Sequence, residues 1–280
     1  MQQHGDGPGH QLPEAVTTNG SGGQTNHGLA WNTAPMSIVQ ASCDKWATTL
    51  TGFLTHPDVS EISFTSPESG EPAGSLTITE GSTASGVRVR VVDTRLLIPA
   101  LGLDATMVHA FAPSESTSPH LLSDLATKHQ PTPDGGTEMT WHFHVDLMPR
   151  VDLIIDPEFI DAVYPPLTQA HTSAYAIEGM MPIAVPHRLR SLASPWLIGA
   201  IVRPTDEVVT RDLFTTYANR WHELVNSPPL VADPASQRER DIKHRATLFN
   251  NDTDPVWQNL AKLVGQADTD TLLAAIRNPV

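Results

Sequence analysis

The chain has 280 residues, of which 39% are apolar, and this is enough to bury a large core within one domain. Its formal charge of −14 argues against a nucleic-acid surface, because phosphate binding needs clustered Lys and Arg. The single cysteine, Cys43, excludes an intramolecular disulfide and a structural zinc site built from several thiolates. No apolar run approaches the roughly 20 residues that cross a bilayer, so we expect no membrane association.

The N-terminal segment differs from the rest in composition. Residues 1–35 are rich in Gly, Gln, Asn and Thr and contain almost no aliphatic side chain, so burial cannot offset the entropy cost of ordering them. They also lack the basic start and apolar run of a secretory signal. The sequence therefore predicts a disordered tail over 1–35, a single domain over 36–280, and a cytoplasmic location.

The first elements of the domain are expected to be a helix and a group of strands. Apolar residues recur with helical spacing over 36–54, and His56-Pro57 stops the pattern. Three β-branched, partly alternating runs follow at 59–66, 74–80 and 87–98, separated by short segments rich in Pro and Gly. Connections this short favour an antiparallel meander.

The middle of the chain mixes helical and strand signals. Ser118 is a suitable helix cap before Pro119, and leucines follow, which predicts a helix over 119–128. A turn at 131–136 precedes the clearest strand, 137–147. Prolines interrupt 165–190, for which we expect a helix and a loop. The remaining expectations are a helix at 157–164, a strand at 196–203, and helices at 206–226, 236–246, 255–264 and 268–277.

Strands in the first two thirds and helices gathered at the end are typical of an α+β fold. We expect an α/β/α sandwich, with a central antiparallel β-sheet flanked by helices on both faces. Neither a Gly-rich phosphate loop nor a dinucleotide fingerprint is present, so no bound nucleotide cofactor is expected.

The strand at 140–147 carries the most distinctive pattern. Its period of two places His142, His144 and Asp146 on one face, and leaves an apolar face that packs on helices. Three buried ionisable groups need partners or a cavity, because leaving them unpaired is costly. We therefore expect this polar face to line a pocket.

Three interpretations of that face stay open. Two histidines and a carboxylate match the ligands of iron or zinc, but alternation spreads the three side chains over about 13 Å. Only His142 and His144 would then share an ion, with a third ligand from elsewhere. A structural role would pair Asp146 with Arg150 or a backbone amide. In the third interpretation the histidines perform acid–base chemistry near neutral pH.

Ordered short motifs from about residue 90 to 275 give the chain a likeness to a known family. They are Pro119-His120 followed by Asp124, Asp146-Leu147 with Pro149-Arg150 and Asp152-Leu153, Pro157-Glu158-Phe159, Ser194-Pro195, and Arg240-Asp241 with Arg245, Asp252 and Trp257. In these motifs the chain resembles red chlorophyll catabolite reductase, a relative of the ferredoxin-dependent bilin reductases. Where this chain has Asp124 the family has Glu, which is one methylene longer.

The resemblance implies a function as well as a fold. It implies an open-chain tetrapyrrole held between the sheet and the C-terminal helices, no bound metal or flavin, and electrons delivered singly by reduced ferredoxin. Carboxylates at Asp124 and Asp252 would supply protons. A helix cap is the structural alternative for Asp252.

Basic and aromatic residues within the same motifs are candidates for substrate binding. Arg240 and Arg245 would grip propionates, Arg150 invites the same role, and Trp257 is the aromatic candidate. The structural alternatives are a solvated pair between Asp241 and Arg245, and a pair between Arg150 and Asp152 or Asp146.

Two departures from the family bear on function. Plant members have aliphatic residues where this chain has His142 and His144. The pocket of this chain therefore has more side chains that can transfer protons. Ferredoxins are acidic and dock on positive surfaces, but only residues 186–250, with a net charge of +2, offer one here.

These observations leave two catalytic functions and one binding function. The first is a ferredoxin-dependent reductase of an open-chain tetrapyrrole or similar conjugated substrate. The alternative is a cofactor-independent cyclase or isomerase of natural-product biosynthesis, with acid–base catalysis by His142, His144, Asp124 and Asp252. A non-catalytic pigment- or lipid-binding protein is the third. In each the partner is a hydrophobic conjugated small molecule, and the sequence leaves a homodimer open.

Overall fold

The computed structural model describes residues 33–132 and 134–280. Most of the expected N-terminal tail, residues 1–32, lies outside the described residues. The first described helix, α1, spans Thr33–Thr51, so it begins and ends three residues earlier than the spacing of apolar residues predicts. No helix among the described residues is long and apolar enough to span a bilayer.

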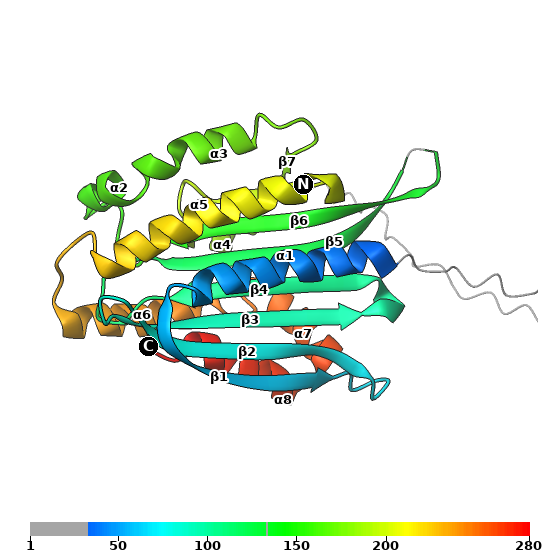
Figure 1. The fold of residues 1–280 in the computed structure, drawn as a ribbon, viewed down its shortest axis with the longest axis horizontal. Helices are drawn as coiled ribbons and strands as arrows, with labels where there is room; N and C mark the ends of the chain where they lie inside the picture. Colours follow the sequence, from blue (N-terminus) through cyan, green and yellow to red (C-terminus); the bar gives the residue numbers. More distant parts are fainter. Residues whose placement is uncertain (1–32, 133) are drawn as a thin grey trace, which may run out of the picture. The chain divides into compact units, whose positions relative to one another are not determined.

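Within the described residues, one antiparallel sheet forms the centre of the fold (Figure 1). Its eight strands are arranged in the order β1-β2-β3-β4-β5-β6-β8-β7. Their bounds are β1 Leu54–Thr65, β2 Pro72–Thr83, β3 Arg88–Ile98, β4 Leu103–Phe111, β5 His120–Pro131, β6 Thr137–Met148, β7 Met181–Pro182 and β8 Ile198–Val202. Six strands follow one another as neighbours, which confirms the predicted meander.

Helices cover both faces of this sheet (Figure 1). One layer holds α1, α2 (Pro157–Val163), α3 (Thr168–Ala174) and α5 (Glu207–Asn226). The other layer holds α4 (His187–Leu192), α6 (Pro234–Leu248), α7 (Val256–Val264) and α8 (Gln266–Arg277). The structure thus confirms the α+β fold, with an antiparallel sheet and helices on both of its faces.

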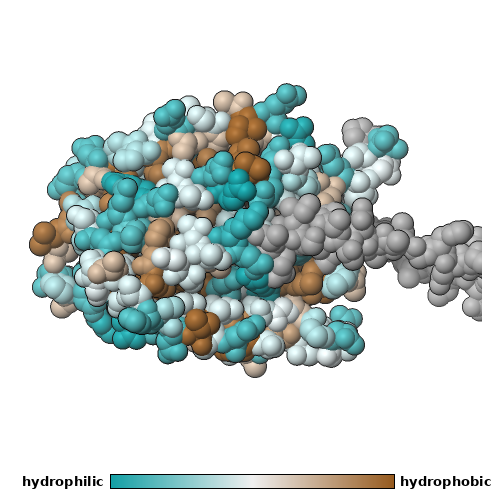
Figure 2. All heavy atoms as spheres, in the orientation of Figure 1, coloured by the Kyte–Doolittle hydropathy of each residue, from teal (hydrophilic) through white to brown (hydrophobic). Residues whose placement is uncertain are grey.

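Aromatic contacts hold the α1 and α5 layer against the sheet. Trp46 of α1 stacks on Phe214 of α5 with ring centroids 4.6 Å apart, and meets Phe143 of β6 edge-on at 5.8 Å. All three side chains are fully buried, which confirms the prediction that the apolar face of the 140–147 strand packs on helices. The outer surface seen in Figure 2 is hydrophilic with small separate apolar areas, as expected for amphipathic helices.

The prediction of a helix over 119–128 was wrong, because this segment is strand β5. Leu121 and Leu125 point into the core beneath α1 and α5, whereas Leu122 points into the opposite core. A short apolar run does not distinguish the two periodicities by itself. Continuous pairing with β6, from His120 opposite Met148 to Pro131 opposite Thr137, gives this segment its strand conformation.

Strand β4 was not predicted from the sequence, although its residues alternate between the two cores. Val108 and Ala110 lie in the core beneath α1 and α5, and Phe111 lies in the other core. The proline-rich stretch 165–190 contains α3, the two-residue strand β7 and the start of α4. This matches the expected mixture of helix and loop.

Candidate active site

Three adjacent strands bring two histidines and an aspartate together on the sheet face beneath α6, α7 and α8. Asp124 of β5 lies directly opposite His144 of β6 in the strand register. The carboxylate Oδ2 of Asp124 is 2.7 Å from the imidazole Nδ1 of His144, a charge-assisted hydrogen bond. Its Oδ1 lies 3.7 Å from Nε2 of His109 on β4. We refer to His109, Asp124 and His144 as the His–Asp–His cluster.

Local charges decide where the proton of this cluster resides. Burial alone would lower the pKa of His144, but the hydrogen bond and the charge of Asp124 outweigh it, so the net shift is upward. Burial alone would raise the pKa of Asp124, but hydrogen bonding to His109 and His144 brings it well below its usual range. The geometry therefore favours an ionised carboxylate beside a protonated imidazole.

The other ring nitrogen of His144 has no partner. Its Nε2 atom is buried and makes no hydrogen bond among the described residues. A buried donor without an acceptor costs about 1–3 kcal/mol, so this position suits an acceptor atom of a bound molecule. The His144 imidazolium can give a proton from Nε2 while Nδ1 stays bonded to Asp124.

The segment between α6 and α7 contributes aromatic and acidic groups to the cluster. Phe249 stacks on the His109 ring at 5.8 Å, and Trp257 of α7 meets Phe249 edge-on at 5.8 Å. Asp254 is half-buried beside them, and both burial and the charge of Asp124 raise its pKa. The charge of Asp254 in turn helps to raise the pKa of His144.

Half-buried apolar side chains from β3 and β4 share this face of the sheet. They are Ile98, Leu103, Ala105 and Met107, which pack against the core beneath α6, α7 and α8. The cluster thus lies beside an apolar, partly accessible surface.

The structure separates the two carboxylates that the family resemblance assigns to proton transfer. Asp124 lies at the centre of the cluster. The Asp252 side chain is 83% exposed and pairs with Arg188 of α4 at 3.6 Å. Asp254, two residues later, is the carboxylate in this segment whose charge acts on His144, and the charge of Asp124 acts on it in turn.

The alternation predicted for β6 is confirmed, but its three polar residues have different surroundings. His142 is half-buried, and burial together with the charge of Lys128 lowers its pKa. Asp146 is fully buried and accepts hydrogen bonds from the backbone amide and the hydroxyl of Ser194. The backbone-amide alternative for Asp146 is therefore confirmed, and a pair between Asp146 and Arg150 is wrong.

Arg150 and Arg245 meet a common carboxylate, Asp241, inside the protein. Arg150 Nε lies 3.1 Å from Asp241 Oδ1, and Arg245 Nε donates to Asp241 Oδ2 at 2.9 Å. His120 and Ser114 also bond to the same carboxylate. All three charged side chains are fully buried, so the alternative pair between Asp241 and Arg245 exists but is not solvated. The alternative pair between Arg150 and Asp152 was wrong.

This network joins segments that are distant in sequence. Arg150 also donates to the backbone carbonyls of Pro113, Ser114 and Ser118. Arg245 donates to the carbonyl of Ile276 in α8. Most donors of the Arg150 and Arg245 guanidinium groups thus meet protein acceptors, although Nη2 of Arg245 has no hydrogen-bond partner among the described residues. Their full burial favours a structural role over propionate binding.

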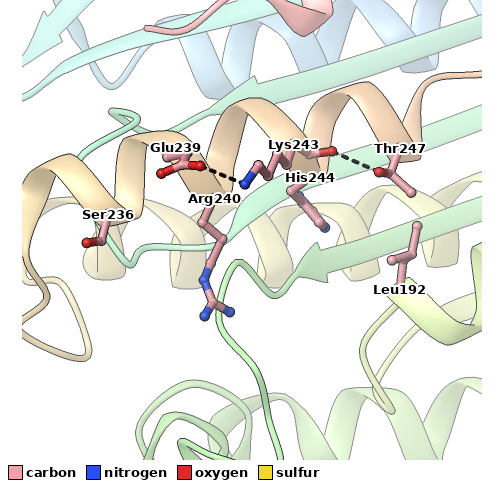
Figure 3. Close-up of a pocket in the computed structure, with 7 residues that line it drawn as sticks. All are labelled: Leu192, Ser236, Glu239, Arg240, Lys243, His244 and Thr247. Atoms are coloured by element: carbon pink, nitrogen blue, oxygen red, sulfur yellow. Dashed lines mark hydrogen bonds and ion pairs between the residues drawn. The ribbon is translucent and has the colours of Figure 1, made fainter.

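The remaining predicted binding residues lie nearer the surface or in the core. Trp257 is almost fully buried in the core beneath α6, α7 and α8. Arg240 is exposed on α6 and lines a groove between α4 and α6 (Figure 3). No group of three or more His, Cys, Asp or Glu residues in the described part of the chain is arranged to hold a metal ion.

Sequence reasoning missed His109, Phe249 and Asp254. His109 was missed because strand β4 was not predicted. The alternation of β4 residues between the two cores is the sequence signal that would have placed His109 on the face beneath α6, α7 and α8. Asp254 follows Asp252 in a polar turn, and only the path of the chain shows which carboxylate points inward.

Comparisons with known proteins support the fold. No family model and no curated protein sequence matches the chain. Among solved structures, the chain is similar to phytochromobilin synthase from tomato, which was solved in complex with biliverdin. The TM-score is 0.60 at 14% sequence identity, and the match covers 86% of this chain and 83% of the tomato chain. The chain therefore has a fold like that of phytochromobilin synthase.

Proposed function

We propose that the protein is an oxidoreductase that reduces an open-chain tetrapyrrole or a similar conjugated molecule with electrons from ferredoxin. The observation that carries this proposal is the His–Asp–His cluster, which lies beside an apolar surface on the sheet face beneath the C-terminal helices. The similarity in fold to a protein solved with biliverdin adds support. The motifs shared with red chlorophyll catabolite reductase point to the same class of substrate.

The proposed reaction adds two electrons and two protons. Two reduced ferredoxins are oxidised, one electron at a time, and the conjugated substrate becomes a dihydro product. Protonation of the one-electron-reduced substrate is the step that needs a positioned acid. No metal or flavin is required in the protein, because the conjugated substrate itself accepts the electrons.

We assign the acid to His144 rather than to a carboxylic acid. Asp124 has a lowered pKa and stays ionised, so it holds and charges the His144 ring. His109 supports Asp124 from the other side. Asp254, rather than Asp252, is the second carboxylate of the site, because its negative charge helps to raise the pKa of His144. His142 lies two residues before His144 on β6 and has a supporting role on the same face.

The test is a reduction assay with purified protein, reduced ferredoxin and its reductase under anaerobic conditions. Biliverdin and red chlorophyll catabolite are the substrates, and absorbance follows loss of conjugation. Turnover that requires ferredoxin supports the proposal, and the variant His144→Gln should lose it. The absence of both binding and turnover with either substrate would contradict it.

One observation favours a second function, a cofactor-independent cyclase or isomerase. The formal charge of −14 opposes docking of an acidic electron donor, whereas proton transfer by His144 and Asp124 needs no donor. Conversion of a conjugated substrate without any ferredoxin would favour this alternative. The same assay, run with the donor omitted, distinguishes the two.

A further inference from the structure

A groove of about 420 Å³ lies between α4 and α6. Its lining residues are Leu192, Ser236, Glu239, Arg240, Lys243, His244 and Thr247, all from α6 except Leu192 (Figure 3). Ser236, Arg240 and His244 follow one another at intervals of four residues, so they share one side of the helix. Figure 3 shows the Arg240 and His244 side chains extending from the same side of α6.

His244 contributes a polar atom that lacks a partner. Its Nδ1 is buried and makes no hydrogen bond among the described residues. Burial, and then the charge of nearby Arg150, lowers the pKa of His244 to about 4, so the ring is neutral at neutral pH. A neutral imidazole donates from one nitrogen and accepts at the other. With Nδ1 enclosed, Nε2 is the ring nitrogen that a molecule in the groove would meet.

Arg240 contributes a charge that lacks a partner. It makes neither a hydrogen bond nor an ion pair with any residue that the structure describes. Its neighbour Arg238, by contrast, pairs with Glu115. The one carboxylate in the groove, Glu239, is already neutralised by Lys243 at 2.6 Å. In a chain with a charge of −14, this leaves an unpaired guanidinium beside a hollow.

We propose that this groove binds the oxyanion group of a small molecule, a carboxylate or a phosphate, through Arg240 and His244. The planar guanidinium of Arg240 would hold two oxygens at once. His244 would donate from its other ring nitrogen, Nε2, which unlike Nδ1 is not enclosed by the protein, and Ser236 adds a hydroxyl on the same side of the helix. Leu192 offers apolar contact to the carbon part of the molecule. The site itself does not depend on the proposed function, but its assignment to an acidic arm of the substrate rests on that function.

The oxyanion has two sources, which the experiment separates. It belongs either to an acidic arm of the molecule bound at the His–Asp–His cluster or to a separate small anion. His244 precedes Phe249 by five residues, a rise of about 7.5 Å along a helix. Phe249 in turn stacks on His109, so the groove and the cluster are connected through α6.

The test titrates inorganic phosphate and propionate separately into the full chain labelled with ¹⁵N-histidine. Long-range NMR follows the ring nitrogens of His244, which the variant His244→Gln identifies. We expect a saturable shift, and at least about tenfold weaker binding in Arg240→Gln, a loss of one charge-assisted contact. Arg238→Gln is the matched control, because it removes the same charge from the same helix outside the groove, and it should change binding less than about twofold.

Equal weakening in the two arginine variants would overturn the proposal, because it would show general charge attraction only. Biliverdin and its dimethyl ester then identify the source. A His244 shift with the free acid alone assigns the groove to the substrate's acidic arm, and a shift with phosphate or propionate alone assigns it to a separate anion. A His244 signal that none of these compounds moves overturns the site. Failure of the proposed function would appear in a separate measurement, the reduction assay, as an absence of biliverdin turnover.

Discussion

His144 and Asp124 face each other across β5 and β6, with Nδ1 and Oδ2 separated by 2.7 Å. This contact fixes the ring orientation of the histidine and leaves its Nε2 without a hydrogen-bond partner among the residues that the structure describes. The same contact raises the pKa of the imidazole and lowers that of the carboxylate. One pair therefore sets both the position and the acidity of the proposed proton donor.

Replacing Asp124 by Asn should lower the pKa of His144, because the ring loses its hydrogen bond to a carboxylate and the neighbouring negative charge. We expect kcat to fall by about 10²-fold or more, the range for loss of positioned acid catalysis. NMR titration of the His144 ring and steady-state kinetics measure the two effects. An unchanged His144 titration in this variant would contradict the assignment. His222 lies on α5, in the helix layer on the opposite face of the sheet. The variant His222→Gln is therefore a control that should leave the His144 titration and kcat unchanged.

The pH dependence of stability should show the signs of this pair. Because the pKa of His144 is raised on folding, its stabilising contribution is fully present below the unfolded value, near 6.5, and is lost as the pH rises through the folded value. Because the pKa of Asp124 is lowered, its contribution is present above about 3.9 and is lost on acidification. The difference in unfolding free energy between wild type and His144→Gln should thus be largest between about pH 4 and 6.5. A difference that increases above this range would show the opposite sign.

Asp254→Asn and Asp252→Asn form a matched pair of variants two residues apart. We expect Asp254→Asn to lower the pKa of His144, because its charge acts on that ring. The fall in rate at high pH should therefore move to lower pH, since the proposed donor must be protonated. Asp252→Asn should leave the His144 titration unchanged, since that carboxylate is exposed and pairs with Arg188. The reverse result would restore Asp252 to the role that the family resemblance implies.

Breaking the buried network should be costly. Arg150→Ala removes one of two guanidinium groups from Asp241 and leaves a fully buried, partly uncompensated charge. We expect a loss of about 3–5 kcal/mol in the free energy of unfolding, measured in urea. Arg238→Ala breaks an exposed pair with Glu115 and should cost about 1 kcal/mol or less. Similar losses in both variants would contradict the structural role of the network.

The sequence correctly predicted the helices and strands whose local pattern of apolar residues fits only one type of secondary structure. The alternation around His142 and His144 identified β6, and the amphipathic spacing around Trp221 identified α5. It failed at Leu121 and Leu122, because adjacent leucines suit a helix face as well as a strand between two cores. The pairing partner of β5 decided the outcome, and that partner is not a local property.

The candidate site was only partly accessible from the sequence for the same reason. His144 and Asp124 were both identified as candidates, but their contact depends on the register of two strands. Arg150 and Arg245 looked like ligand-binding residues because a guanidinium has the same donors for a propionate and for Asp241. Only burial, which depends on the whole fold, distinguishes these two roles.

The turn between β5 and β6 determines which residue of β6 lies opposite Asp124, although Asp124 is far from the turn. The turn is closed by backbone hydrogen bonds between Thr132 and Gly136 and from Gly135 to Thr132. Asp124 lies about 23 Å away, at roughly 3.3 Å per residue. Yet the length of this turn sets which residue Asp124 meets, because a slip of one residue exchanges the two faces of a strand. Adding or removing a single residue in the turn would place an apolar side chain opposite Asp124, so the contact between Asp124 and His144 depends on the loop as much as on the two residues themselves.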